Sequence, residues 1–234
     1  MRCVYALVAL LLTASAVQAQ SPDRPIVVEL FTSQGCNSCP PADEFLRELS
    51  TQPDVLAIEF HVDYWDYIGW RDPFAQRYFT ERQRAYSRAL EQRYVFTPQM
   101  VIDGRFQEVG SDRAAVLRLI ERARTMRTDA PTIEAVPGER ATVRVSGPVH
   151  GPAVVWAAAL DPAHETDVLR GENGGRRLVN TNTVRRMQRL GVYSGTTEEY
   201  PMIACEPHQA VAIVLQGANG YGPIYAAKLI APQR

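Results

Sequence analysis

Residues 26–41 read IVVELFTSQGCNSCPP, an apolar run that leads through a short turn into two cysteines. The first six residues are mostly apolar or β-branched, and the TSQG segment favours a turn, so the run predicts a buried strand. Proline is tolerated only in the first turn of a helix, so the two prolines indicate a helix that begins near Cys36 or Asn37. The motif from Cys36 to Cys39 is therefore expected at a strand-to-helix junction.

A strand, two helices and a hairpin are predicted in the remainder of the first half. They span 55–62 (strand), 73–94 (helix), 100–102 with 106–109 (hairpin) and 112–127 (helix). Asp103-Gly104 is a strong signal for a hairpin turn, and Ser111 is the expected cap of the last helix. This order closes a small mixed sheet covered by helices, an α/β fold with a helical insert at 64–94.

The character of the chain changes near Pro131, where short strands between glycine and proline turns replace the helical periodicity. The strands are predicted at 132–136, 141–146, 153–160, 210–215 and 223–230, with a brief helical pattern at 183–190. The second half therefore predicts a β-sandwich-like C-terminal module. We expect two domains, at residues 25–128 and 131–234.

Residues 1–19 have the features of a cleaved signal peptide. Arg2 precedes a short apolar run, and Val17-Gln18-Ala19 offers a small-residue cleavage site. The run is too short to span a bilayer, and no second apolar stretch follows. We therefore expect a periplasmic or secreted protein with no membrane attachment after signal removal.

The composition is that of an ordinary globular protein, with 22% charged and 46% hydrophobic residues. The net charge is −1, with neither a basic excess nor an acidic tail, which argues against a nucleic-acid partner. The sequence indicates no cofactor and gives no sign of the oligomeric state.

The cysteine pair predicts thiol chemistry. A helix N-terminus stabilises a thiolate, and the thiolate is the form that attacks a disulfide. Cys36 is accordingly the expected nucleophile and Cys39 the resolving thiol, with a structural disulfide or half of a metal site as alternatives. Cys205 is expected to be a buried thiol, with an intermolecular pairing site as the alternative.

The cysteine motif, the strand after it and the Thr97-Pro98 dipeptide before the hairpin resemble, in this order, the thioredoxin superfamily. The resemblance implies a thioredoxin-like fold, a cis peptide bond before Pro98 and a backbone there that pairs with extended substrate segments. The chain departs from the superfamily at Asn37-Ser38, which is neither the Gly-Pro of thioredoxins nor the Pro-His of the oxidising periplasmic enzymes. Without a histidine or lysine there, the redox direction stays open.

A closer resemblance covers most of the chain. Its motifs are 29–43 (ELFTSQGCNSCPPAD), 60–66 (FHVDYWD), Gly69-Trp70, Thr97-Pro98-Gln99 and Gly171-Glu172-Asn173. They are similar to those of an exported bacterial family that is catalogued only as a domain of unknown function. The resemblance implies a thioredoxin-like fold with a β-rich C-terminal part, and it supplies no reaction.

His61 follows the second predicted strand, and the resemblance implies that this strand ends on the active-site side. His61 could tune Cys36 as a general base, or complete a copper or zinc site with Cys36 and Cys39. A hydrogen bond to Asp63 or to the backbone is the structural alternative.

Four aromatic residues gather between the second strand and the insert helix: Tyr64, Trp65, Tyr67 and Trp70. They predict either a substrate-binding rim, with Trp65 and Trp70 as binding residues, or a packing cluster.

Two further features lie outside the motif. Arg82 and Gln83 are expected on a solvated face of the insert helix, with a reach to the active site as the alternative. The Gly-rich segment 171–177 lacks the features of a phosphate loop and is expected as a loop between strands that could fold over the cysteine face.

Together these features favour an exported thiol-disulfide oxidoreductase that acts on a protein or on a small thiol or disulfide. Cys36 attacks, Cys39 resolves and Pro98 orients the substrate backbone. Two alternatives remain: a copper or zinc binding or delivery module that uses Cys36, Cys39 and His61, and a non-catalytic binding protein with a structural disulfide.

Overall fold

The computed structural model describes residues 24–126, 131–138 and 141–231, so the predicted signal peptide at 1–19 lies outside the described residues. The first half contains β1 (Ile26–Thr32), α1 (Pro40–Leu49), β2 (Val55–His61), η1 (Asp66–Ile68), α2 (Arg77–Ala89), β3 (Gln99–Ile102), β4 (Phe106–Val109) and α3 (Arg113–Thr125). The second half contains β5 (Thr132–Val136), β6 (Thr142–Ser146), β7 (Ala153–Asp167), β8 (Arg177–Tyr193), β9 (Glu198–Pro201), β10 (Ala210–Gln216), η2 (Ala218–Gly220) and β11 (Ile224–Ile230). None of the helices in the described part of the chain has both the length and the apolar character that crossing a bilayer requires.

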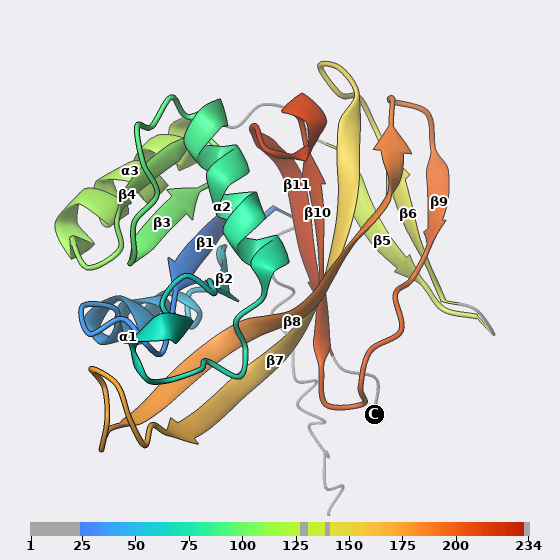
Figure 1. Cartoon of the computed structure of the whole chain (residues 1–234). Coiled ribbons are helices and arrows are strands. Elements are labelled where there is room, and N and C mark those ends of the chain that lie inside the picture. Colours follow the sequence, from blue (N-terminus) through green and yellow to red (C-terminus); the bar gives the residue numbers. More distant parts are fainter. Residues whose placement is uncertain (1–23, 127–130, 139–140, 232–234) are drawn as a thin grey trace, which may run out of the picture.

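One mixed sheet carries strands from both halves of the chain, in the order β11-β10-β7-β8-β2-β1-β3-β4 (Figure 1). β1 is parallel to β2 and antiparallel to β3, which forms the predicted hairpin with β4. The halves join where β2 runs parallel to β8, at the register pair Glu59 and Thr183. The molecule is thus a mixed α/β protein with a large mixed sheet and few helices. Strands from both ranges, 25–128 and 131–234, share this sheet. The division into two domains at these bounds stays a prediction.

Alternation along β1 divides the core into two layers, because successive side chains of a strand point to opposite faces. Ile26, Val28 and Leu30 pack against α1 and α3 on one face. Val27 and Phe31 face the other way, toward α2 and the strands of the second half. The strongly apolar sequence of β1 is therefore explained by burial on both sides.

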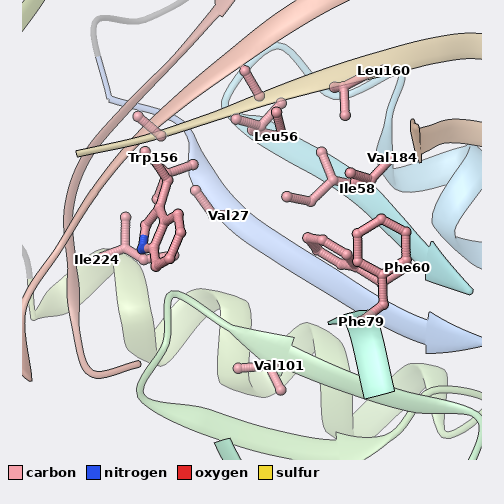
Figure 2. Close-up of a cluster of buried hydrophobic side chains, with 14 of the residues drawn as sticks. Val27, Leu56, Ile58, Phe60, Phe79, Val101, Trp156, Leu160, Val184 and Ile224 are labelled. Carbon is pink, nitrogen blue, oxygen red and sulfur yellow. The ribbon is translucent and has the colours of Figure 1, made fainter. Parts of the chain in front are cut away.

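The second cluster connects the two halves of the chain. Figure 2 shows Trp156 of β7 and Ile224 of β11 in the same cluster as Val27 of β1 and Phe79 of α2. Fully burying a side chain of this kind stabilises the fold by about 1.5–3 kcal/mol. Apolar packing therefore holds the second half against the first, in addition to the shared sheet.

A smaller sheet, in the order β5-β6-β9, covers the opposite face of β7 and β10. Ile133 and Val143 of the small sheet pack with Val155 and Ile213 of the large one. The two layers give the second half a sandwich-like form, and its inner layer is a continuation of the large sheet.

The helical pattern predicted at 183–190 is wrong, because these residues lie in β8 and pair with β7. Register shifts between the two strands interrupt the alternation of buried and exposed residues. Apolar side chains then recur at Val184, Met187 and Leu190, a spacing that imitates a helix. β7 is longer than the strand predicted at 153–160, and β8 was not predicted as a strand. Residues 161–183 of the two strands and their connection form a two-stranded arm that reaches past β2 toward α1 (Figure 1).

Two local predictions in the first half need correction. The cap of α3 is Asp112, whose carboxylate accepts a hydrogen bond from the backbone N–H of Ala115 at 2.9 Å, and not Ser111. Arg82 and Gln83 do not lie on a solvated face, because both side chains are fully buried under α2.

Arg82 is buried because β1 carries a buried acid opposite it. Its guanidinium donates to Glu29 at 2.7 Å and to Gln216 of β10 at 3.0 Å. The rings of Tyr86, Phe60, Trp156 and Tyr221 lie around the guanidinium, with centroids 5.0 to 5.7 Å away. A buried pair of this kind depends on having both partners, since either charge alone would be desolvated without compensation.

We expect Arg82→Met to lower the free energy of unfolding by about 3–5 kcal/mol, because it removes the charged partner of Glu29 in the core. Urea denaturation followed by circular dichroism measures the change. Arg77→Met is the matched control: its partner is Glu81 on the same helix, the two side chains are 82% and 54% exposed, and the loss should stay below about 1 kcal/mol. Similar losses of stability in both variants would contradict a stabilising role for the buried pair of Arg82 and Glu29.

Candidate active site

The disulfide-bonded pair Cys36 and Cys39 lies between β1 and α1, with its Cα atoms 5.5 Å apart. The prediction that the helix begins near Cys36 or Asn37 is wrong, because α1 begins at Pro40 and Cys39 is its N-cap. The two prolines lack an N–H and fit the first helical positions, so the first hydrogen bonds of the helix are accepted by the Cys39 carbonyl. Cys36 therefore precedes the helix and lies farther from its dipole than expected.

Two hydroxyl groups face the sulfur of Cys36. Thr97 Oγ1 donates to Cys36 Sγ at 3.3 Å, and Ser38 Oγ lies 3.3 Å from the same atom. The peptide bond between Thr97 and Pro98 is cis, as the resemblance implied. Hydroxyl donors favour a thiolate over a thiol, so they can take the part that a histidine or lysine within the motif would otherwise play.

The tip of the arm, residues 168–176, covers the cysteine loop. Asn173 is fully buried, and its amide donates to the carbonyl oxygens of Gln34 at 3.0 Å and of Cys36 at 2.9 Å. Arg176 donates to Asn173 Oδ1 at 2.8 Å and fixes the orientation of the amide. The predicted loop between strands does lie over the cysteine face.

The covered sulfurs are closed to solvent. Cys36 is 1% exposed and Cys39 is 0% exposed. Thiol-disulfide exchange requires a thiolate to make contact with a disulfide sulfur. An external thiol therefore reaches this pair only after a local opening, and the tip is one of the elements that contact the cysteine loop.

Gln34 joins the cysteine loop to the arm. Its side-chain amide donates to Thr166 and to Asn180, each at 3.0 Å, and accepts from the indole N–H of Trp70 at 3.1 Å. Its backbone N–H donates to Asp72 at 2.8 Å. One buried residue thus sets the relative position of β1, the arm and the aromatic segment.

His61 lies between two buried carboxylates. Nδ1 is 2.6 Å from Asp72 Oδ2, and Nε2 is 3.2 Å from Glu59 Oε1 without the alignment of a hydrogen bond. Burial by itself would lower the pKa of His61, but Asp72 and Glu59 outweigh burial and raise the pKa to about 10. The expected bond to Asp63 is not made, because Asp63 accepts from Thr80 instead.

A protonated imidazole is neither a general base nor a metal ligand, so the surroundings of His61 favour neither of its predicted roles. Across residues 24–126, 131–138 and 141–231, no three histidine, cysteine, aspartate or glutamate side chains are grouped to hold a metal ion. The metal-binding alternative gains no support from this geometry.

Sequence reasoning missed the buried acids behind the pair. Glu59 accepts hydrogen bonds from Asn180 and from the Thr181 backbone, and Asp43 accepts from Thr32 at 2.7 Å. Burial and the nearby Glu59 raise the pKa of Asp43 well above its ordinary value. A charged residue inside an otherwise apolar strand was the signal that could have identified Glu59.

The aromatic segment is partly a packing cluster and partly open to solvent. Trp65 and Trp70 are half-buried and direct their indole N–H groups inward, to Thr97 at 2.7 Å and to Gln34 at 3.1 Å. Tyr67 is 81% exposed. A substrate-binding role for Trp65 and Trp70 stays a prediction.

Cys205 is exposed, so the expectation of a buried thiol is wrong. It lies in the connection between β9 and β10, and connections stay at the surface because their backbone groups need water.

Fold and site together define a mixed α/β protein with a buried Cys-x-x-Cys disulfide under a β-arm. The chain belongs to the family described as "Protein of unknown function (DUF1223)", whose model matches residues 27–216.

Two solved structures are similar to this chain. Protein AGR_C_4864 from Agrobacterium tumefaciens shares 30% identity, over 89% of this chain and 95% of that chain, with a TM-score of 0.79. HBP35 of Porphyromonas gingivalis shares 14% identity, over 89% of this chain and 75% of that chain, with a TM-score of 0.61, which is a likeness in fold alone. None of the curated proteins compared with this chain matches it.

The raised pKa of His61 predicts a loss of stability at alkaline pH. Because the folded pKa of about 10 exceeds the ordinary value of 6.5, the stabilisation is complete below pH 6.5 and is lost as the pH rises through about 10. An NMR titration of the imidazole, with urea denaturation at several pH values, measures both quantities. Asp72→Asn should bring the pKa of His61 down and flatten the pH dependence, and an unchanged His61 titration in that variant would contradict the pairing.

Loosening the tip should expose the disulfide. Asn173→Ala removes the two hydrogen bonds between the tip and the cysteine loop, each with a net contribution of about 1 kcal/mol. Reduction of the disulfide by dithiothreitol should therefore accelerate about tenfold or more. Stopped-flow measurement of thiol release gives the rate. Leu169→Ala, at a residue of the same tip that is 75% exposed, is the control and should leave the rate unchanged. Equal rates for wild type and Asn173→Ala would show that the tip does not limit access.

Proposed function

We propose that this protein is an exported thiol-disulfide oxidoreductase with a thioredoxin-like fold, acting in the periplasm or after secretion. The observation that carries the proposal is the Cys36–Cys39 disulfide at a strand-to-helix junction, with the cis Thr97-Pro98 peptide beside it and the Thr97 hydroxyl directed at Cys36 Sγ. The order strand, helix, strand, helical insert, hairpin and helix supports the assignment of the fold.

In the proposed reaction, a substrate thiolate attacks Cys36 Sγ and breaks the Cys36–Cys39 bond. The bond electrons leave with Cys39 as a thiolate, and the substrate is held in a mixed disulfide with Cys36. A second substrate thiolate then attacks the mixed disulfide, which yields an oxidised substrate and a reduced cysteine pair, and the protons of the two substrate thiols are released to water or to the pair. Reduction of a substrate disulfide follows the same steps in reverse.

The surroundings of Cys36 suit its proposed role as the attacked and attacking sulfur. Thr97 and Ser38 place hydroxyls near its sulfur, and a thiolate formed there would accept hydrogen bonds from both. Cys39 is the N-cap of α1, so its thiolate would lie at the helix N-terminus, where the dipole favours negative charge. Both thiolates that the reaction forms therefore have a stabilising partner.

The proposed partner is a protein, or a small thiol or disulfide, which enters when the tip opens. The backbone at Pro98 would orient an extended substrate segment.

Exchange assays with single-cysteine variants test the proposal. Wild type should exchange with glutathione disulfide or reduce insulin, Cys36→Ser should lose this activity, and Cys39→Ser should accumulate mixed disulfides that mass spectrometry detects. Cys205→Ser is the control and should retain full activity. The proposal fails if neither wild type nor Asn173→Ala exchanges with any test disulfide. Reduction of the pair only on unfolding would favour the structural-disulfide alternative, and stoichiometric copper or zinc that His61→Ala abolishes would favour the metal module.

A further inference from the structure

We propose that Trp65 is a positioning residue that sets the acidity of the Cys36 thiol through the hydroxyl of Thr97. The inference deepens the proposed redox function and rests on it, because the acidity of Cys36 matters only if Cys36 exchanges. It assigns a role to the aromatic segment that packing does not account for.

Three atoms form a directed chain of hydrogen bonds. Trp65 Nε1 donates to Thr97 Oγ1 at 2.7 Å, and Thr97 Oγ1 donates to Cys36 Sγ at 3.3 Å. An indole N–H can only donate, and a threonine hydroxyl carries one proton and two lone pairs. Trp65 therefore occupies a lone pair of Thr97, which leaves the single hydroxyl proton free to point at the sulfur.

The backbone around Trp65 keeps the indole in place. Trp65 precedes η1 and lies against the loop in front of the cysteines, so that a Cβ at Gly35 would be 3.1 Å from Trp65 Cβ and 3.2 Å from its carbonyl oxygen. Any larger residue at Gly35 would push the two segments apart. This close approach gives the donor a fixed position relative to Cys36.

Tyr64 is the competing acceptor for the Thr97 proton. Its hydroxyl lies within reach of Thr97, and its own proton goes to Gln83 Oε1 at 3.2 Å. Burial, as the largest effect, raises the pKa of Tyr64 to about 12, so the phenol stays neutral. A neutral phenol oxygen is a weaker acceptor than a thiolate, and the Thr97 proton is therefore expected at Cys36 whenever the thiolate forms.

Other charged groups lie around the cysteine loop, and they are the same in wild type and in a variant that lacks the Trp65 indole nitrogen. Glu172 of the tip faces the Asn37 N–H at 3.4 Å, Asp72 accepts from the Gln34 N–H with His61 behind it, and Asp43 lies on α1. The indole nitrogen of Trp65 bonds to Thr97 and to none of these groups. Removing that nitrogen therefore changes the relay and leaves the charges in place.

The consequence is chemical. A thiolate accepts hydrogen bonds more strongly than a thiol does, so a donor held toward Cys36 lowers the pKa of its thiol. The same donor favours the reduced pair, in which an external dithiol has given two electrons and become a disulfide, and it makes the pair more oxidising.

The test uses a background in which Cys36 is the single thiol, made by Cys3→Ser, Cys39→Ser and Cys205→Ser. The pKa of Cys36 is read from its thiolate absorbance in the ultraviolet and from the pH dependence of its alkylation. Trp65→Phe keeps an aromatic ring and removes the N–H, and it should raise the pKa of Cys36 by about one unit, a tenfold lower thiolate fraction below the pKa. Thr97→Val should raise the pKa by at least as much.

The double variant distinguishes a relay from two independent effects. Trp65→Phe combined with Thr97→Val should give the same pKa as Thr97→Val alone, because Trp65 acts through that hydroxyl. Trp70→Phe is the matched control, since its indole bonds to Gln34, and it should leave the pKa unchanged. Tyr64→Phe should leave the pKa unchanged or lower it.

An unchanged pKa in Trp65→Phe, or additive shifts in the double variant, would overturn the inference. If Trp65→Phe fails to fold, the comparison of Thr97→Ser with Thr97→Val in the presence of Trp65 replaces it: the serine variant should keep the low pKa, and equal shifts in both would overturn the relay. These measurements need no substrate. Loss of exchange activity would therefore remove the proposed function while the relay still stood, and an unmoved pKa would remove the relay while exchange still stood.

Discussion

The carboxylate of Glu59 is fully buried in the middle of β2, and its need for hydrogen-bond donors organises the region around the cysteine pair. Asn180 Nδ2 supplies one donor at 2.6 Å and the Thr181 backbone supplies another at 2.8 Å, both from the arm. An ionised carboxylate buried without donors would cost many kcal/mol. The arm therefore cannot leave β2 without a large penalty, and its fixed base brings the tip onto the cysteine loop.

The arm is consequently held by more buried hydrogen bonds at its base than at its tip. At the base, Asn180 bonds to both Gln34 and Glu59, and Asn182 bonds to the Ala57 carbonyl at 2.9 Å. At the tip, the buried contact with the cysteine loop is made chiefly by Asn173. Local opening starts where few contacts must break, so this gradient makes the tip the natural point of access.

Much of the first half could be predicted from its sequence, because its signals are local. The strand before Cys36 and the Asp103-Gly104 turn each follow from a few neighbouring residues, and the cis peptide bond before Pro98 was implied by the resemblance. The resemblance also implied that Thr97-Pro98 faces the cysteine pair, and Thr97 does lie beside Cys36, while the roles of these residues stay a prediction.

What could not be predicted depends on residues far apart in the chain. Gln34 is hydrogen-bonded to Asn180, and Arg82 is hydrogen-bonded to Gln216. No pattern of neighbouring residues predicts such pairs. The strand β8 imitated a helix because its register with β7 shifts, and the register belongs to both strands. Cys205 is likewise exposed because the connection between β9 and β10 lies at the surface. The residues next to Cys205 in the sequence do not show where that connection lies.

The turn at Gly104 has a consequence for how such a chain can evolve. Gly104 has a φ of 63°, and a Cβ there would collide with the carbonyl oxygen of Gly222, more than a hundred residues later in the chain. A hairpin turn of the first half thus packs directly against a loop of the second. Arg82 and Gln216 form a second contact between the halves, a hydrogen bond. Recombination that exchanged one half for a foreign sequence would break both contacts at once. Changes at these contacts in one half therefore require matching changes in the other, and we expect the two halves to diverge together.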